Sequence, residues 1–233
     1  MKNTIKKIII FIILLLLMVI FPYIPILIFN LKIESFNYTT KILYNLACDI
    51  GLMIIIFFLY KKELIQNFKD YFHNFKDNFE ESFKYYFIGL IGMIVSNILI
   101  VLLVKGANAN NENTVRELIT KAPIYMIFSV SIYAPFIEEI IFRKSIKDMI
   151  LSIKDNKITK YLYILSSGLI FALMHIIGSS TSIYDYFYII PYASLGIAFA
   201  ALYYKKDNIF YTIMIHSMHN TLAIILYFIG GIV

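Results

Sequence analysis

The sequence predicts an all-α membrane protein: a polytopic transmembrane helical bundle of about seven spans, with one amphipathic helix in the membrane interface. Of the 233 residues, 60% are hydrophobic, and the mean hydropathy is +0.76, whereas ordinary soluble domains are about 45–50% apolar. The apolar residues gather in runs of roughly 20, the length that crosses a bilayer as a helix. No internal repeat or low-complexity linker separates these runs, so a single membrane domain is expected.

The runs divide the chain into two parts. The runs that are long and apolar enough to span a membrane are 8–29, 41–60, 86–104, 123–145, 161–178, 186–204 and 209–229. The first three, together with the interfacial helix, form an N-terminal part, residues 1–122, which is characterised only by its hydropathy. The last four form residues 123–229, where unusual polar residues occur.

The distribution of basic residues favours a cytoplasmic N-terminus. With that orientation the inner segments hold 16 of the 21 Lys and Arg residues, and the outer segments hold Lys32, Lys41, Lys105, Arg116 and Lys121. Cytoplasmic loops of membrane proteins carry such an excess. The heavy use of Lys, Ile, Asn, Tyr and Phe is typical of AT-rich bacterial genomes, so a multi-pass protein of a bacterial cell membrane is expected.

The net charge of +6 does not indicate a nucleic-acid partner, because the basic residues flank the spans and form no basic face. Lysine-rich loops that face an anionic leaflet explain the charge, so the lipid bilayer is the expected partner. The one cysteine, Cys48, lies in an apolar run. A single cysteine excludes an intrachain disulfide framework and a CxxC metal site. No feature of the sequence indicates whether the chain is monomeric or oligomeric.

An amphipathic helix is predicted for residues 62–84, between the second and third spans. Its phenylalanines recur at steps of three or four residues, which places them on one helical face; they are Phe68, Phe72, Phe75, Phe79 and Phe83. Such a helix lies in the interface with its aromatic side toward the lipid. Two alternatives stay open: a soluble helix packed on the protein, and an eighth, half-buried membrane helix.

Three of the last four spans carry polar side chains at a depth where such groups are costly and usually functional. They are Glu138, Glu139 and Arg143 in the fourth span, His175 in the fifth, and His216 and Asn220 in the seventh. Glu139 and Arg143 stand four residues apart, so they share a helical face and can form an ion pair. Glu138 lies about 100° further round the helix and has no partner in it.

The same spacing relates the other polar groups. Phe171 is one turn from His175 and can shield its ring, and His216 and Asn220 point the same way because they are four residues apart. A glutamate and an imidazole that face a wet cavity suit general acid–base work. A second imidazole with an amide suits the stabilisation of a developing oxyanion. Together these groups indicate a hydrolase that activates water.

Three motifs resemble, in order, the EExxxR, FxxxH and HxxxN motifs of the CAAX-protease and bacteriocin-processing family (CPBP or Abi), the type II CAAX prenyl endopeptidase-like proteins. They are EEIIFR (138–143), FALMH (171–175) and HSMHN (216–220). The resemblance covers about residues 123–229 and implies a helical intramembrane endopeptidase of the glutamic type. It implies a membrane-associated peptide or protein as substrate, and in bacteria the processing of a peptide signal or bacteriocin self-immunity.

The resemblance also implies roles for the catalytic residues. Glu138 would activate the attacking water with help from His175. His216 and Asn220 would form the oxyanion hole. No cofactor is expected.

Two further residues would orient Glu138, namely Glu139 and Arg143, through their ion pair. His219 matches no motif position and is expected to pack against the site or to support it.

Other functions stay open on the sequence. Glu138, His175 and His216 could bind zinc, since a catalytic zinc commonly keeps three protein ligands and a water. Against zinc, Arg143 would repel a cation, and Asn220 would have no role. The chain could also be a non-catalytic bacteriocin-immunity or scaffold protein that keeps the motifs for folding. A transporter is disfavoured, because no inverted repeat or pair of broken helices is evident.

The expected spans leave the site residues at unequal depths. At 1.5 Å per residue, Glu138 and His216 lie about 11 Å from the cytoplasmic ends of their spans, and His175 lies about 21 Å from its own. The depths would agree if the fourth span continued through the sequence KDMILSI, residues 147–153, or if the fifth span began later.

Overall fold

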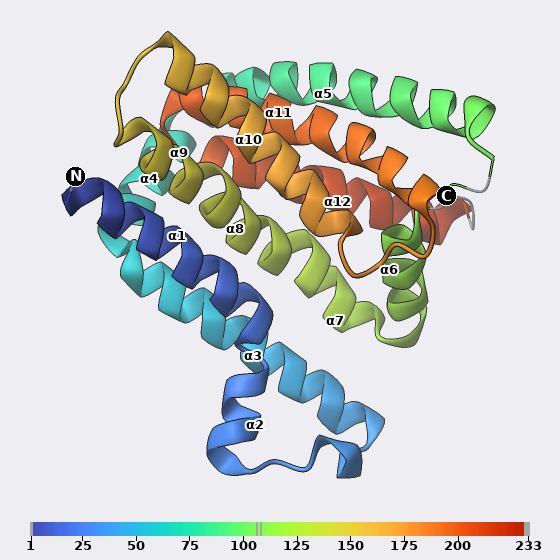
Figure 1. Cartoon of the computed structure of the whole chain (residues 1–233). Helices are drawn as coiled ribbons and strands as arrows, with labels where there is room; N and C mark the ends of the chain where they lie inside the picture. Colours follow the sequence, from blue (N-terminus) through green and yellow to red (C-terminus); the bar gives the residue numbers. More distant parts are fainter. Residues whose placement is uncertain (1, 106, 108, 231–233) are drawn as a thin grey trace.

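The computed structural model describes residues 2–105, 107 and 109–230, and it contains no strand within them (Figure 1). The residues outside this description are Met1, Gly106, Asn108 and residues 231–233. The first three belong to the N-terminal part of the sequence-based division, residues 1–122, and the last three follow its second part, residues 123–229. The first helices are α1 (Lys2–Ile20), α2 (Tyr23–Phe29), the 3-10 turn η1 (Ile33–Ser35), α3 (Tyr38–Leu59), α4 (Lys61–His73), α5 (Phe75–Leu103) and α6 (Asn110–Lys121). The remaining ones are α7 (Pro123–Phe128), η2 (Ser129–Tyr133), α8 (Ala134–Glu138), η3 (Glu139–Ser145), α9 (Ile146–Leu151), α10 (Lys157–Ile176), η4 (Ile183–Tyr188), α11 (Ile189–Lys206) and α12 (Phe210–Gly230).

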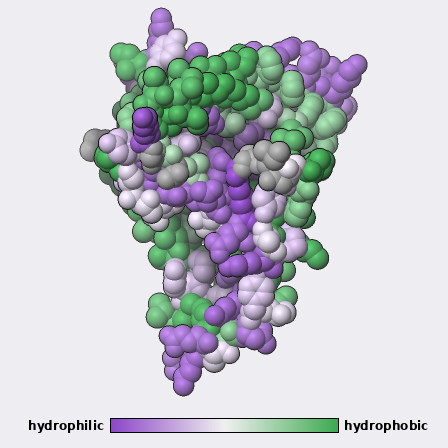
Figure 2. Space-filling view, turned by 90° about the vertical axis from the view of Figure 1, so that its right-hand side faces the viewer, coloured by the Kyte–Doolittle hydropathy of each residue, from purple (hydrophilic) through white to green (hydrophobic). Residues whose placement is uncertain are grey.

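Among the described residues, seven helical segments are long and apolar enough to cross a membrane. They confirm the predicted all-α, polytopic fold class, and the chain is a multi-pass membrane protein. The outward faces of α1, α3 and α5 expose large aliphatic side chains, the kind of surface that lipid tails cover. Figure 2 views the end of the molecule at which α6 lies: polar residues occupy the middle of this face, and hydrophobic residues flank them.

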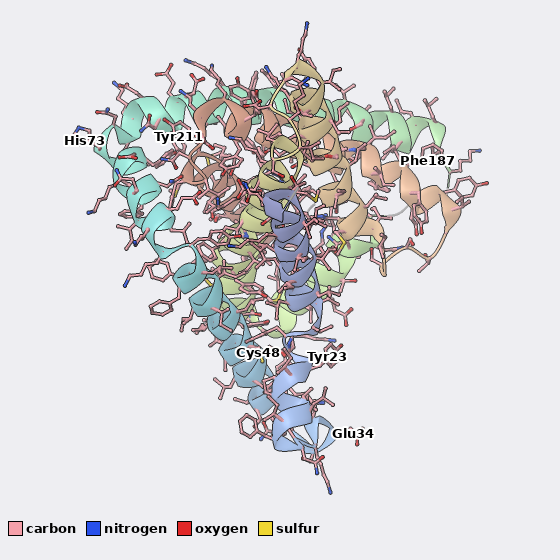
Figure 3. All side chains as sticks on the ribbon, turned by 60° about the vertical axis from the view of Figure 1, so that its left-hand side comes forward. Tyr23, Glu34, Cys48, His73, Phe187 and Tyr211 are labelled. Carbon is pink, nitrogen blue, oxygen red and sulfur yellow. The ribbon has the colours of Figure 1, made fainter. Side chains whose placement is uncertain are left out.

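The predicted first span, residues 8–29, is wrong at its C-terminal end. The helix α1 ends at Ile20, and after a turn at Phe21 and Pro22 the short helix α2 begins at Tyr23. A proline inside a helix removes one backbone donor and clashes with the preceding turn, so Pro22 ends α1. The segment from α2 to η1 projects from the bundle, with Glu34 at its tip (Figure 3).

The single amphipathic helix predicted for residues 62–84 is also wrong as drawn. The chain turns at Asn74, so α4 and the first turns of α5 are separate helices. Asn78 of α5 donates its amide hydrogens to the carbonyls of Asp70 and Tyr71 at the end of α4. An amide that satisfies these terminal carbonyls stabilises the break.

One face of α4 packs on the protein while its aromatic face remains exposed. Leu64, Asn67 and Tyr71 are buried, whereas Phe68 and Phe72 are 48% and 38% exposed. Helix α4 therefore packs on the protein, as one of the two alternatives had it, and also keeps an exposed aromatic face. Its position in the membrane interface stays a prediction. His73 lies at the outer corner of this turn (Figure 3).

The fourth span is longer than predicted. Helical segments follow each other without interruption from Pro123 to Leu151, so the span includes the sequence up to residue 151. Glu138 is therefore 13 residues, about 20 Å, from the end of its helix. Two of the segments, η2 and η3, are wound as π-helices, which the sequence analysis did not predict.

Small residues bring α10 and α11 into close contact. A Cβ atom on Gly196 would lie 2.9 Å from Gly168, and one on Gly168 would lie 2.7 Å from the backbone nitrogen of Ile197. Ala200, one turn further along α11, is fully buried. This contact positions the ring of Phe171, on α10, beside α11.

The segments that the sequence assigns to one side of the membrane meet at one end of the bundle. Lys144 near the end of the fourth span pairs with Glu63 of α4 at 2.8 Å, and Lys7 of α1 lies 3.6 Å from Asp148. At the opposite end, Thr120 of α6 is hydrogen-bonded to Tyr227 of α12 at 2.7 Å. The contacts agree with the alternation of seven spans. Which end faces the cytoplasm stays a prediction.

Cysteine labelling in intact cells should decide the orientation. Asn113 and Asp155 are exposed at opposite ends of the bundle, and Cys48 is buried. With the N-terminus inside, a membrane-impermeant maleimide should label Asn113→Cys in intact cells and Asp155→Cys only after permeabilisation. The reverse pattern would invert the orientation, and labelling of both from one side would contradict the topology.

Candidate active site

The fourth span carries its two glutamates at a change of helix type. Glu138 is the last residue of α8, and Glu139 is the first residue of the π-helix η3, whose residues are all buried. Single π-helical turns inside α-helices are rare and occur often at functional sites. In this wider turn Glu139 and Arg143 still lie on one face, as their contact shows.

Glu139 and Arg143 form the ion pair that the sequence predicted. Both side chains are completely buried, and Arg143 Nε lies 3.0 Å from Glu139 Oε2. The guanidinium lies 4.5 Å from the centre of the Phe171 ring and 5.9 Å from that of Phe199. Arginine stacks favourably on aromatic faces when both are removed from water, so the two rings complete the environment of this charge.

His216 bridges the two glutamates. Its Nδ1 lies 2.8 Å from Glu139 Oε1, and its Nε2 lies 3.8 Å from Glu138 Oε2. An ionised carboxylate has no hydrogen to donate, so Glu139 accepts this hydrogen bond and His216 Nδ1 carries the hydrogen. The other ring nitrogen, Nε2, is then directed to Glu138. Glu139 therefore contacts both Arg143 and His216, a connection that spacing alone did not reveal.

Glu138, unlike Glu139, has no arginine paired with its carboxylate among the described residues. Its side chain is 20% exposed, and its Oε2 atom is buried with no hydrogen-bond partner among the described residues. A buried polar atom without a partner is costly. Glu138 is thus held near an imidazole yet keeps its capacity to accept a proton or a hydrogen bond.

The ring of Phe171 contacts those of both His175 and His216. The centre of the Phe171 ring lies 4.4 Å from that of His175 and 5.7 Å from that of His216. The Tyr192 ring stacks on His175 at a centre-to-centre distance of 4.7 Å. His175 Nδ1 lies 2.9 Å from the Phe171 carbonyl, so Nδ1 donates and Nε2 is left as the basic nitrogen. No hydrogen bond joins His175 to Glu138 in the described part of the chain.

Asn220 is hydrogen-bonded to the backbone of the fourth span, and its expected role in an oxyanion hole stays a prediction. Its amide nitrogen donates to the backbone carbonyl of Val130 at 2.8 Å, across to the fourth span. One of its two N–H groups is thereby engaged by the protein itself. Its neighbour His219 contacts α5, where its Nδ1 lies 3.2 Å from the Tyr86 hydroxyl, so the expectation that His219 packs beside the site fits its contact.

An apolar groove runs beside these residues and shares the fourth span and α12 with them. Its volume is about 560 Å³. The residues that line it are Met53, Ile127, Ser131, Ile132, Phe136, Phe210, Ile213, Met214, Ser217 and Thr221. The hydroxyl of Ser131 is buried without a partner among the described residues. A groove of this composition suits an apolar segment that still offers some polar groups.

Three residues of the site were missed by sequence reasoning: Phe199, Tyr192 and Val130. An aromatic residue in an apolar span carries no signal that distinguishes a neighbour of the site from one that faces lipid. The contact of Val130 is made by its backbone, which no side-chain pattern reports.

The alternative set of zinc ligands was Glu138, His175 and His216. Within the residues that the structure describes, no group of three His, Cys, Asp or Glu side chains is arranged to hold a metal ion. Arg143, which shares the Glu139 carboxylate with His216, adds a positive charge next to any such ion. The arrangement does not fit a zinc site, and metal independence itself stays a prediction.

Comparison with known proteins bears on this arrangement. Residues 120–222, which contain all three motifs, match the family model described as type II CAAX prenyl endopeptidase Rce1-like. This segment belongs to the Rce1-like family. The family resemblance of the sequence is thereby confirmed.

Individual relatives agree with the family. The membrane-embedded CAAX protease MroQ of Staphylococcus aureus is 32% identical over 57% of this chain and 51% of its own length. YdiL of Bacillus subtilis, whose name assigns it provisionally to the membrane peptidases, is 31% identical over 52% of this chain and 44% of its own. The UPF0177 protein YvdC of Lactococcus lactis is 24% identical over 57% and 47%. The chain therefore spans about half the length of these curated relatives. No solved structure matches it significantly.

Proposed function

We propose that this chain is an intramembrane endopeptidase that hydrolyses a peptide bond of a membrane-associated peptide or protein with a water activated by Glu138. The observation that carries the proposal is Glu138 Oε2, which has no hydrogen-bond partner among the described residues and lies 3.8 Å from His216 Nε2 within a membrane span. Ionisable residues in such positions are rarely retained without a function. Membership of residues 120–222 in the Rce1-like family supports a peptidase.

The hydrolysis would proceed by general base catalysis. Glu138 takes a proton from water as the water oxygen forms a bond to the carbonyl carbon of the substrate. The tetrahedral intermediate then collapses, the C–N bond breaks, and the proton held by Glu138 passes to the leaving amine. His175, with its basic Nε2, would hold the same water or a second one, as the resemblance implies, and no hydrogen bond to Glu138 is needed before substrate binds.

Glu139 and Arg143 would act on His216 as well as on Glu138. Glu139 holds the His216 ring by Nδ1, and Arg143 balances the charge of Glu139 at 3.0 Å. A His216 that carries hydrogen on both nitrogens can donate to a negatively charged oxygen from Nε2, which is the role of an oxyanion-hole donor. The buried carboxylate of Glu139 would stabilise that protonated form.

The apolar groove supports a substrate that reaches the site from within the membrane. It is formed by α3, the fourth span and α12, and its lining includes Ser217, the residue after His216 in sequence. An apolar peptide segment could occupy it, while the hydroxyls of Ser131 and Ser217 could bond its backbone. Processing of a peptide signal and bacteriocin self-immunity are both compatible with such a substrate. A non-catalytic immunity or scaffold protein remains the competing proposal.

A cleavage assay with the purified chain tests the function and its metal dependence together. We expect the chain, reconstituted in lipid vesicles, to cleave members of a quenched-fluorescence library of apolar peptides. Because Glu138 itself would serve as the base, activity should persist after treatment with a strong chelator, with elemental analysis confirming that metal has been removed.

Two outcomes would contradict this prediction. Loss of activity with the metal, followed by recovery on addition of zinc, would make Glu138 a ligand or the base of a zinc-bound water. Absence of cleavage by a correctly folded chain that still protects cells from a bacteriocin would favour the non-catalytic immunity or scaffold protein.

A further inference from the structure

Pro135 interrupts the backbone hydrogen bonds of the fourth span. Proline has no N–H group, so it cannot donate to a carbonyl of the preceding turn. Directly before it, η2 (Ser129–Tyr133) is wound as a π-helix, and the N–H of Ala134 donates to the carbonyl of Ser129, five residues earlier. The wider turn is the local response of the helix to the proline.

This winding leaves the carbonyl of Val130 without a donor in its own helix. In α-helical pairing Val130 would accept from the N–H of Ala134, but that group bonds to Ser129. In π-helical pairing it would accept from residue 135, which is the proline. In a bilayer no water takes the place of a missing donor, so an unsatisfied carbonyl there is costly.

Asn220 supplies the donor from α12. Its Nδ2 lies 2.8 Å from the Val130 oxygen, and because a carbonyl can only accept, the amide nitrogen must face it. One turn earlier on the same face, His216 bonds Glu139 at 2.8 Å. The helix α12 is therefore joined to the fourth span at two points one turn apart.

We propose that Asn220 is a positioning residue, which closes the backbone gap left by Pro135 and thereby holds His216 beside Glu138. This assignment differs from the oxyanion-hole role that the family resemblance implies, because the amide acts on the protein's own backbone. The importance of the Glu138–His216 spacing for hydrolysis rests on the proposed function. The fastening of α12 to the fourth span does not.

A double-mutant cycle tests the proposal by thermal unfolding of the purified chain in detergent. In the native background, Asn220→Ala leaves the Val130 carbonyl unsatisfied and should lower the Tm by roughly 3–8 °C. In a Pro135→Ala background, residue 135 regains an N–H that can donate to Val130. Asn220→Ala should then lower the Tm by less than half as much. Equal losses in the two backgrounds would overturn the proposal.

The imidazole of His216 gives a readout that a merely structural role would not move. The chain contains four histidines, so labelling with ¹⁵N-histidine allows their ring nitrogens to be distinguished by NMR. Asn220→Ala should shift the resonances of the His216 ring nitrogens, and adding Pro135→Ala should return them toward the wild-type positions. An unchanged His216 spectrum in Asn220→Ala would contradict the proposal.

Two matched controls are available in the chain. Thr221, the next residue of α12, donates its hydroxyl within its own helix, to the carbonyl of Ser217 at 2.7 Å, and makes no side-chain hydrogen bond to the fourth span among the described residues. Thr221→Ala should therefore show no coupling with Pro135→Ala. Pro191→Ala removes a proline from another span, α11, and should not rescue Asn220→Ala. None of these measurements requires peptidase activity, so a failure of the proposed function would leave them interpretable.

Discussion

Replacing Glu138 by Gln should lower the rate of peptide hydrolysis by about 10²–10⁴-fold, the usual contribution of a general base, while the chain still accumulates in the membrane. Gln has nearly the same shape but cannot take a proton from water. Among the described residues Glu138 Oε2 has no hydrogen-bond partner that the change would remove, and His216 Nε2 lies 3.8 Å from it. The measurement is cleavage of a peptide substrate by wild-type and Glu138→Gln protein at equal membrane abundance.

A second carboxylate inside the membrane offers a matched control. Asp49 of α3 is 8% exposed and accepts a hydrogen bond from the Tyr125 hydroxyl at 3.0 Å. Asp49→Asn keeps an oxygen for Tyr125 and should retain activity, so a loss specific to Glu138→Gln reports on the site and not on any buried charge. Full activity of Glu138→Gln would rule out the proposed base. Bacteriocin immunity that persists in cells carrying Glu138→Gln would favour the immunity or scaffold alternative.

Much of the fold could be predicted from hydropathy because the bilayer restricts what a chain can do. Backbone groups in lipid must be satisfied internally, so an apolar run of about 20 residues can be assigned as a helix. The errors occur where local chemistry overrides length. Pro22 and the Asn74 turn both interrupt helices whose apolar or aromatic pattern continues on either side.

The site was predictable to the extent that it depends on helical spacing. The pair of Glu139 and Arg143 follows from a separation of four residues, and the structure has it at 3.0 Å. Contacts between spans follow from packing, which spacing does not encode. Thus the bond from His216 to Glu139, the stacking of Tyr192 on His175 and the acceptor of Asn220 could not be predicted. The π-helix η2 precedes Pro135 directly, whose presence was visible in the sequence but whose backbone consequence was not.

The buried ion pair between Glu139 and Arg143 should dominate the stability of the site. Removing one partner of a buried pair leaves an uncompensated charge and typically costs about 3–5 kcal/mol. Glu139→Leu and Arg143→Leu should therefore each lower the Tm by roughly 6–20 °C and reduce accumulation in the membrane. The exposed pair of Glu80 and Lys84 has the same spacing on α5, at 2.9 Å, and Glu80→Gln should have no measurable effect.

The double variant Glu139→Leu/Arg143→Leu should separate the stability of the fold from its function. Apolar residues of similar volume in place of both charges are often neutral or stabilising, so most of the lost Tm should return. Activity should stay lost, because His216 no longer has an acceptor for its Nδ1 hydrogen and its Nε2 is no longer directed to Glu138. The measurement is Tm and peptide cleavage for the four proteins of the cycle. Recovery of activity together with stability would show that the pair serves folding alone, and that Glu138 needs no orienting contact through His216.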